Sequence, residues 1–140
     1  MIGAAIFAQL ASLNASLSLG LTNPDGSLRI YPGYQHMADK AYPAICYDYE
    51  NYTPDVAFDG AAGTAVFDLK IMCIGDTYND ADTLGQQVAT ALDATRGTWG
   101  SVTVQGCFLE EITTDRFLDT DMESILYWIT DLTFHVAITI

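Results

Sequence analysis

Basic residues are scarce in this sequence. Five lysines and arginines stand against eighteen aspartates and glutamates, which gives a formal net charge of −13 at pH 7. Holding a phosphate backbone takes clustered lysine and arginine, so this composition excludes the usual nucleic-acid-binding surface and disfavours contact with an anionic membrane. Such acidity can serve solubility or a salty environment alone. A sharper hypothesis is a surface that stays clear of nucleic acid or mimics it.

Cysteine pairs and long apolar runs are also missing. Cys46, Cys73 and Cys107 are an odd number without a CxxC spacing, which argues against zinc or dithiol redox chemistry. We expect reduced thiols in the core of a cytosolic protein. No apolar run reaches the ~18 residues of a membrane-spanning helix, and the apolar N-terminus lacks the basic lead of a signal peptide. The sequence therefore predicts one domain over residues 1–140, away from membranes.

Metal-binding runs are not recognisable in the sequence. The acidic residues from Asp76 to Asp82 do not have the ligand spacing of a calcium loop. Asp119, Asp121 and Glu123 have the first part of that spacing, but Ser124 replaces the required glycine and Thr130 replaces the distal glutamate. We expect no bound metal.

Catalytic motifs are equally absent. Glu110 and Glu111 are adjacent, so on a regular strand they would point to opposite faces instead of forming an acid–base pair. Neither His36 nor His135 lies near a serine or cysteine nucleophile in a recognisable motif. No glycine-rich phosphate loop occurs. We therefore expect no enzymatic activity and no cofactor.

Hydrophobic periodicity predicts a strand followed by a helix in the middle of the chain. From Thr64 to Ile74 apolar and polar side chains alternate, which is typical of a strand with one buried face. After Gly75 the apolar side chains recur at helical spacing as far as Leu92, and Arg96 and Gly97 are stop signals.

The flanking segments complete an α+β pattern. An apolar helix begins the chain, Leu28–Tyr31 is a short extended piece ended by Pro32, and Gly33–Tyr42 is polar and irregular. Further strands are predicted at Ala44–Tyr52, at Val102–Thr113 with a bend near Gly106, and at Ser124–Ile140, with an acidic loop at Asp115–Glu123. The order helix-strand-strand-helix-strand-strand predicts a four-stranded, mostly antiparallel sheet with both helices on one face. The other face would be left to water or a partner.

Tyrosines cluster between Tyr31 and Tyr52. They can simply cover a sheet edge, or they can form a protein interface, because tyrosine offers a large contact area together with a hydroxyl group.

The motif Arg29-Ile30-Tyr31-Pro32, followed by Tyr42-Pro43-Ala44-Ile45-Cys46-Tyr47, resembles the tail terminator (tail completion) proteins of long, flexible-tailed bacteriophages, a family also found in phage-like gene transfer particles. The resemblance extends to a helix carrying Tyr78, Ala81 and Leu84, to Val104-Gln105-Gly106, to an acidic loop and to a long final strand. These motifs occur in the family's order over nearly the whole chain. An insertion at Thr22–Ser27 and the scarcity of lysine depart from the pattern.

The resemblance implies a structural virion protein without catalysis or cofactor. Its expected location is the virion tail or neck, after assembly in the host cytoplasm. Such proteins form a homo-oligomeric ring, usually a hexamer, that stops polymerisation of the tail tube and meets the head–tail connector or stopper protein. Genomic DNA passes through the bore without specific binding. The alternatives are another neck component, such as a head-closure protein, an acidic DNA-mimic binding protein, and a small acid-based enzyme.

Two groups of residues are candidates for the interface of such a ring. The first is aromatic, and the second belongs to the predicted acidic loop: Tyr31, Pro32, Tyr34 and Tyr42, then Asp115, Asp119, Asp121 and Glu123. Acidic side chains repel a DNA backbone at close range, so some of the second group could face the bore. A solvated outer loop is the equally weighted alternative.

Overall fold

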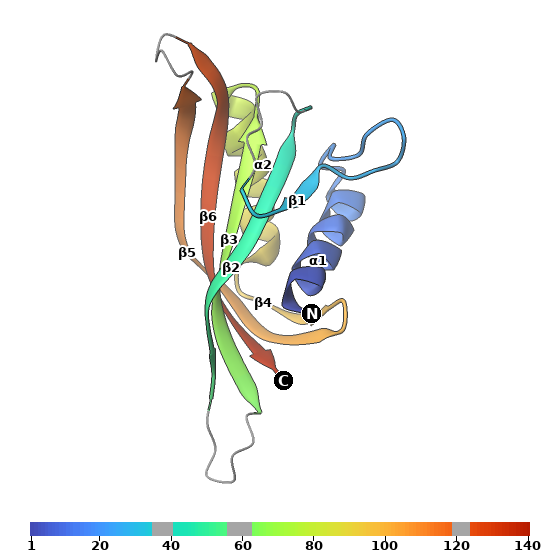
Figure 1. Cartoon of the computed structure of the whole chain (residues 1–140), viewed down its shortest axis with the longest axis vertical. Coiled ribbons are helices and arrows are strands. Elements are labelled where there is room, and N and C mark those ends of the chain that lie inside the picture. Colours follow the sequence, from blue (N-terminus) through green and yellow to red (C-terminus); the bar gives the residue numbers. More distant parts are fainter. Residues whose placement is uncertain (35–40, 56–62, 119–123) are drawn as a thin grey trace.

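The computed structural model describes residues 1–34, 41–55, 63–118 and 124–140 of the chain (Figure 1). Two helices and six strands follow one another in the order α1 (Ile2–Leu17), β1 (Ile30–Pro32), β2 (Ala44–Pro54), β3 (Thr64–Gly75), α2 (Tyr78–Leu92), β4 (Thr95–Trp99), β5 (Val102–Leu118) and β6 (Ile125–Thr139). None of the helices in these ranges has the length and apolarity needed to cross a membrane.

The six strands form one mixed sheet in the order β1-β2-β3-β6-β5-β4, which curves into half a barrel (Figure 1). The β1–β2 pair is parallel and every other pair is antiparallel. The predicted four-stranded sheet is therefore wrong in strand number and in character. The two additional strands, β1 and β4, are short and lie at the two edges of the sheet.

Neither additional strand was predicted as part of the sheet: the first comes from the predicted extended piece, and the second from the segment with the predicted helix stop. The extended piece before Pro32 lies beside β2, with Ile30 opposite Ile45. At the other edge, α2 ends at Leu92, and the chain turns back through Ala94, whose φ is 56°. It then pairs with β5, and a register shift between Thr95 and Gly97 accommodates the glycine at φ 145°. A glycine that reads as a helix stop thus lies within an irregular edge strand.

Helices α1 and α2 contribute to one hydrophobic core with the inward side chains of the sheet. Alternation along β3 buries Ala65, Phe67, Leu69, Ile71 and Cys73, as the sequence predicted. On β6 the same face carries Leu132, Phe134, Val136 and Ile138, which are also buried. This core fixes which face of each strand remains outside.

Helix α2 approaches the sheet closely because it carries a glycine where it crosses β6. The Thr77 side chain caps the helix by accepting a hydrogen bond from the Asp80 N–H at 3.1 Å. One face of α2 then packs on β3, β5 and β6. A Cβ on Gly85 would lie 2.4 Å from the Thr130 Cγ2, so no larger residue fits there without movement of the neighbouring atoms.

The buried Arg29 side chain ties the N-terminal segment to the sheet. Its Nε donates to the Pro43 carbonyl at 2.8 Å and its Nη1 donates to the Asn23 Oδ1 at 2.7 Å. Its Nη2 donates to the Gly20 carbonyl. The first residue of the Arg-Ile-Tyr-Pro motif is therefore structural, because it joins the turn after α1 to the start of β2.

Cys46, Cys73 and Cys107 are buried thiols in the core, as the sequence predicted. Burial raises the pKa of the Cys107 thiol to about 12 and raises that of Cys73 further. Both thiols therefore stay protonated, and they act as apolar core residues.

Candidate functional site: the open face of the sheet

The sheet face turned away from both helices is the candidate functional site, and we call it the open face. Its side chains come from alternate positions of the four central strands. Cross-strand pairing aligns Asp48 with Lys70, Lys70 with Thr133, and Thr133 with Glu111, so one row crosses the four central strands. Lys70 lies among acidic side chains, which dominate this face: Asp48, Glu50, Asp68, Glu110, Glu111, Asp115 and Asp131.

One end of the open face is aromatic. The rings of Phe117 and Tyr127 stack with centroids 4.8 Å apart and an interplanar angle of 3°. The Tyr34 and Tyr127 hydroxyls lie 2.5 Å apart, and the rings of Tyr42 and Tyr127 lie 6.1 Å apart. These side chains cover a second small core that includes Ala44, Cys46, Ile74 and the fully buried Tyr127. The prediction left this face to water or a partner. One end of it is instead covered by aromatic side chains of the chain itself.

The predicted aromatic interface residues divide between this cover and the surface. Tyr31 and Tyr42 are partly buried and pack against the second core. Tyr34 remains 46% exposed although its hydroxyl contacts Tyr127, and Pro32 is exposed at the end of β1. Burial, and then the hydrogen bond with Tyr127, raises the pKa of the Tyr34 hydroxyl well above its ordinary value. Tyr31 and Tyr42 thus cover part of the sheet, while a role of Tyr34 and Pro32 in a protein interface stays a prediction.

The predicted acidic loop is mostly outside the described residues, which omit Asp119, Asp121 and Glu123. Asp115, however, belongs to β5, which continues to Leu118 beyond the predicted end at Thr113. It lies opposite Ile129 of β6, on the open face. The loop prediction was wrong at this position because β5 and β6 keep pairing up to Leu118 and Ile125. Asp115 is thereby placed on the same face as Asp131.

An acidic hollow of about 370 Å³ occupies the middle of the open face. Partial burial raises the pKa of the Asp131 carboxyl above its ordinary value, and Asp115 and Glu111 act in the same direction, while Lys70 opposes them. The Lys70 Nζ lies 3.5 Å from the Glu50 Oε1 and donates to the Thr133 hydroxyl at 3.3 Å. The side chains that line the hollow are mostly polar and include one tyrosine: Tyr34, Asp48, Lys70, Met72, Glu111, Thr113, Asp131 and Thr133.

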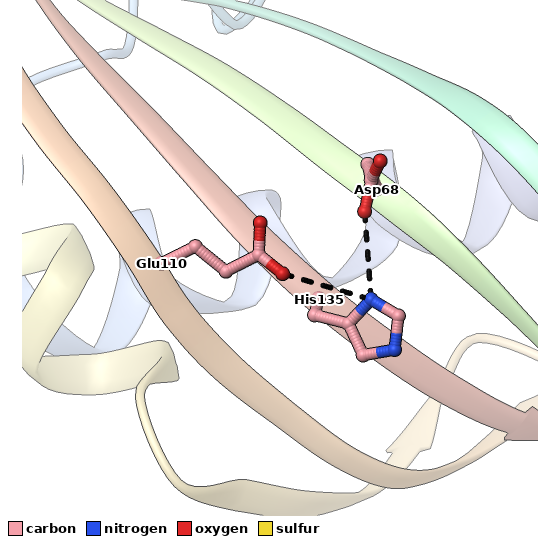
Figure 2. Close-up of side chains that lie close together, drawn as sticks. All are labelled: Asp68, Glu110 and His135. Atoms are coloured by element: carbon pink, nitrogen blue, oxygen red, sulfur yellow. Dashed lines mark hydrogen bonds and ion pairs between the residues drawn. The ribbon is translucent and has the colours of Figure 1, made fainter.

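A histidine and two carboxylates meet beside this hollow (Figure 2). The His135 Nδ1 lies 3.4 Å from the Asp68 Oδ1 and 3.7 Å from the Glu110 Oε1. The second Asp68 oxygen accepts a hydrogen bond from the Asn51 Nδ2 at 2.7 Å. This bond, followed by the contact with His135, lowers the pKa of Asp68. The group can bridge a protonated imidazole between two carboxylates, or it can offer three ligand atoms to a cation.

A β-bulge is what brings Glu110 into this group. The register of β5 against β6 shifts between Leu109 and Glu111, so Glu110 has no partner residue of its own. Such an extra residue breaks the strict alternation of side chains. Glu110 reaches His135, while Glu111 lines the acidic hollow. The prediction that the two glutamates point to opposite faces was therefore wrong.

Comparison with known proteins yields a match at the level of structure. No known protein family matches the sequence, and no curated protein matches it. A chain from a solved structure, "Virion of native gene transfer agent (GTA) particle", has a similar fold, with a TM-score of 0.60 and 18% sequence identity. The similarity covers 79% of this chain and 78% of that chain. At this identity the similarity shows a shared fold.

Proposed function

We propose that this chain is a structural protein of a phage-like virion. The observation that carries the proposal is the fold that it shares, over 79% of its length, with a chain from a gene transfer agent virion. The succession of short motifs from Arg29 to Gly106 supports the same class of protein. Its partners would then be proteins of the particle, and its role would need no catalytic group.

Within that class, we propose a ring-forming tail terminator at the head-proximal end of the tail tube. The motif resemblance supports this role, and a hexamer is the expected ring. Closing a ring requires two different, complementary patches on each subunit. The aromatic end of the open face offers a surface of the kind that one such patch needs, since exposed tyrosine favours protein contacts.

The acidic open face also suits a channel through which DNA must pass. Six copies would carry a formal charge of 6 × (−13) = −78. Lysine or arginine in the bore would make phosphate contacts that slow the passage of DNA, whereas carboxylates repel the phosphates over ~8–10 Å at physiological salt. We therefore propose that the acidic part of the open face, with Asp115, Glu111 and Asp131, is turned toward the bore.

Deletion of the gene from a phage or phage-like element that carries it tests the proposed role. Loss of a tail terminator leaves tube polymerisation unchecked, so electron microscopy should show tails of irregular, excessive length and few joined particles. Loss of a head-closure protein, the alternative, should leave tails of normal length beside heads that have lost DNA. Normal particles would contradict both roles.

Size-exclusion chromatography with light scattering tests self-association. We expect a ring-sized species, either alone or on addition of the tail-tube protein. A strict monomer at high concentration in both conditions would contradict the ring.

The charge-reversed pair Glu111→Lys and Asp131→Lys should assemble but eject DNA poorly. The pair Asp76→Lys and Asp82→Lys, near the start of α2, is a control with the same change in charge.

A further inference from the structure

We propose that Asp68, Glu110 and His135 form a binding site for a divalent transition-metal ion of the Zn²⁺ or Co²⁺ type. The proposal does not depend on the ring, because all three side chains belong to one chain. They come from three neighbouring strands, β3, β5 and β6, and lie together on the open face (Figure 2). Positions so far apart in the sequence share no local motif.

The spacing of the three ligand atoms is close to what a small divalent ion requires. Bonds of about 2.0–2.1 Å in a tetrahedral zinc site place neighbouring ligand atoms roughly 3.3 Å apart. The His135 Nδ1 lies 3.4 Å from the Asp68 oxygen and 3.7 Å from the Glu110 oxygen, and all three atoms lie within 4.8 Å of one another. The Asp68 and Glu110 oxygens, which lie within 4.8 Å of each other, must approach to roughly 3.3 Å to share one ion, and the long, exposed glutamate side chain can supply that movement.

The backbone and a neighbouring amide hold two of the three ligands in place. Asp68 and His135 are direct partners in the β3–β6 register, so their side chains emerge side by side. The Asn51 side chain holds the second oxygen of Asp68, which leaves the first oxygen directed at His135. Outer contacts of this kind orient metal ligands and raise affinity. The bulge in β5 supplies the third ligand, Glu110.

The chemistry of the donor set and its surroundings selects the kind of ion. An imidazole nitrogen with two carboxylate oxygens suits zinc and its neighbours in the first transition row, whereas calcium and magnesium take mostly oxygen ligands. Charged groups nearby include Glu111, next to Glu110, Glu50, opposite Asp68, and Lys70, whose ammonium lies 3.5 Å from Glu50. The exposure of His135, whose side chain is 46% accessible, leaves room for water or a further ligand on the ion.

Cobalt titration of untagged, chelator-treated protein tests the site. We expect saturable binding of one Co²⁺ per chain with visible d–d absorption, and displacement of the cobalt by Zn²⁺. His135→Ala should weaken binding at least tenfold while the circular dichroism spectrum stays unchanged, because the side chain is exposed. His36→Ala, which removes the other histidine, is the matched control and should bind like the parent.

Two further variants separate a built site from general acidity. Asn51→Ala leaves all three ligands in place but removes the amide that orients Asp68, so affinity should fall about tenfold. Glu111→Gln removes an equal charge next to Glu110 and should change affinity less than twofold. The inference would be overturned if the parent showed no saturable binding of Co²⁺, or if His135→Ala bound Co²⁺ as tightly as the parent. It would also be overturned if Glu110→Gln and Glu111→Gln lost the same Co²⁺ affinity. The last result would leave only diffuse attraction to an acidic face.

Discussion

The contact between α2 and β6 makes a prediction that runs against helix propensity. Gly85 lies in the interior of α2, where replacing glycine by alanine ordinarily stabilises a helix by about 1 kcal/mol. In this protein the new methyl group would lie 2.4 Å from the Thr130 Cγ2 and 2.9 Å from its Cβ. Both distances are shorter than real contacts allow, so α2 or β6 must shift.

The expected magnitude follows from the two opposing effects. Forcing a methyl group into a packed core costs about 1–3 kcal/mol, and two contacts under 3.0 Å place this site at the upper end. Subtracting about 1 kcal/mol for helix propensity leaves a net destabilisation of roughly 2 kcal/mol. In a domain of this size that corresponds to a fall in Tm of roughly 5–10 °C.

Urea denaturation followed by circular dichroism measures the effect, and a double-mutant cycle assigns it. Thr130→Ser removes the Cγ2 but keeps the hydroxyl that contacts the Thr114 hydroxyl at 2.9 Å, so it should recover at least ~1 kcal/mol of the Gly85→Ala loss. Gly3→Ala in α1 is the matched control, since a Cβ there would meet nothing within 4 Å. If Gly85→Ala stabilises the protein as Gly3→Ala should, the close approach of α2 to β6 is refuted.

Three other predictions follow from buried or coupled polar groups. Arg29→Lys should lower the free energy of unfolding by roughly 2–4 kcal/mol, because one ammonium cannot donate hydrogen bonds to all three separated oxygens and leaves acceptors unpaired. A loss below ~0.5 kcal/mol in urea denaturation would contradict this. Asn51→Ala should raise the pKa of Asp68 toward its ordinary value in an NMR titration of the carboxyl carbon, and an unchanged pKa would show that the amide is not its main cause. The raised pKa of the Tyr34 hydroxyl stabilises the folded state below the unfolded pKa of about 10, and this stability is lost as the pH rises through the folded pKa. The free energy of unfolding of Tyr34→Phe should therefore fall less than that of the parent between pH 8 and pH 11. Equal losses would contradict the assignment.

Much of the inner sheet could be predicted from the sequence, because burial on one side leaves a regular pattern. The alternation along β3 and the second half of β6 follows directly from contact with the helices. The bend predicted near Gly106 corresponds to a register shift between Val104 and Gly106. These features depend on local residue choice, which the sequence displays.

The edge strands and the candidate metal site depend on pairing between distant segments, which leaves little local trace. β1 has three residues and is held by its neighbour β2. The run Thr113-Thr114-Asp115-Arg116 makes this part of β5 polar, so composition alone suggested a loop. Nothing local to Glu110 marks the bulge, and His135 meets Asp68 only through the β3–β6 register. The sequence signal that remains is a lone histidine amid polar positions of a strand.

The place of β6 in the sheet has a consequence for how this protein is made. A ribosome delivers residues 125–139 after every other element described, yet they occupy the centre, between β3 and β5. Until they emerge, the β1–β3 part and the β4–β5 part of the sheet are two separate ribbons, and β3 and β5 each have an edge without its partner strand. The sheet is therefore completed when this strand enters between β3 and β5, a step that includes the sequence-distant β3–β6 contacts and is correspondingly slow. Truncation before Ile125 should accordingly yield aggregation in place of a smaller folded unit.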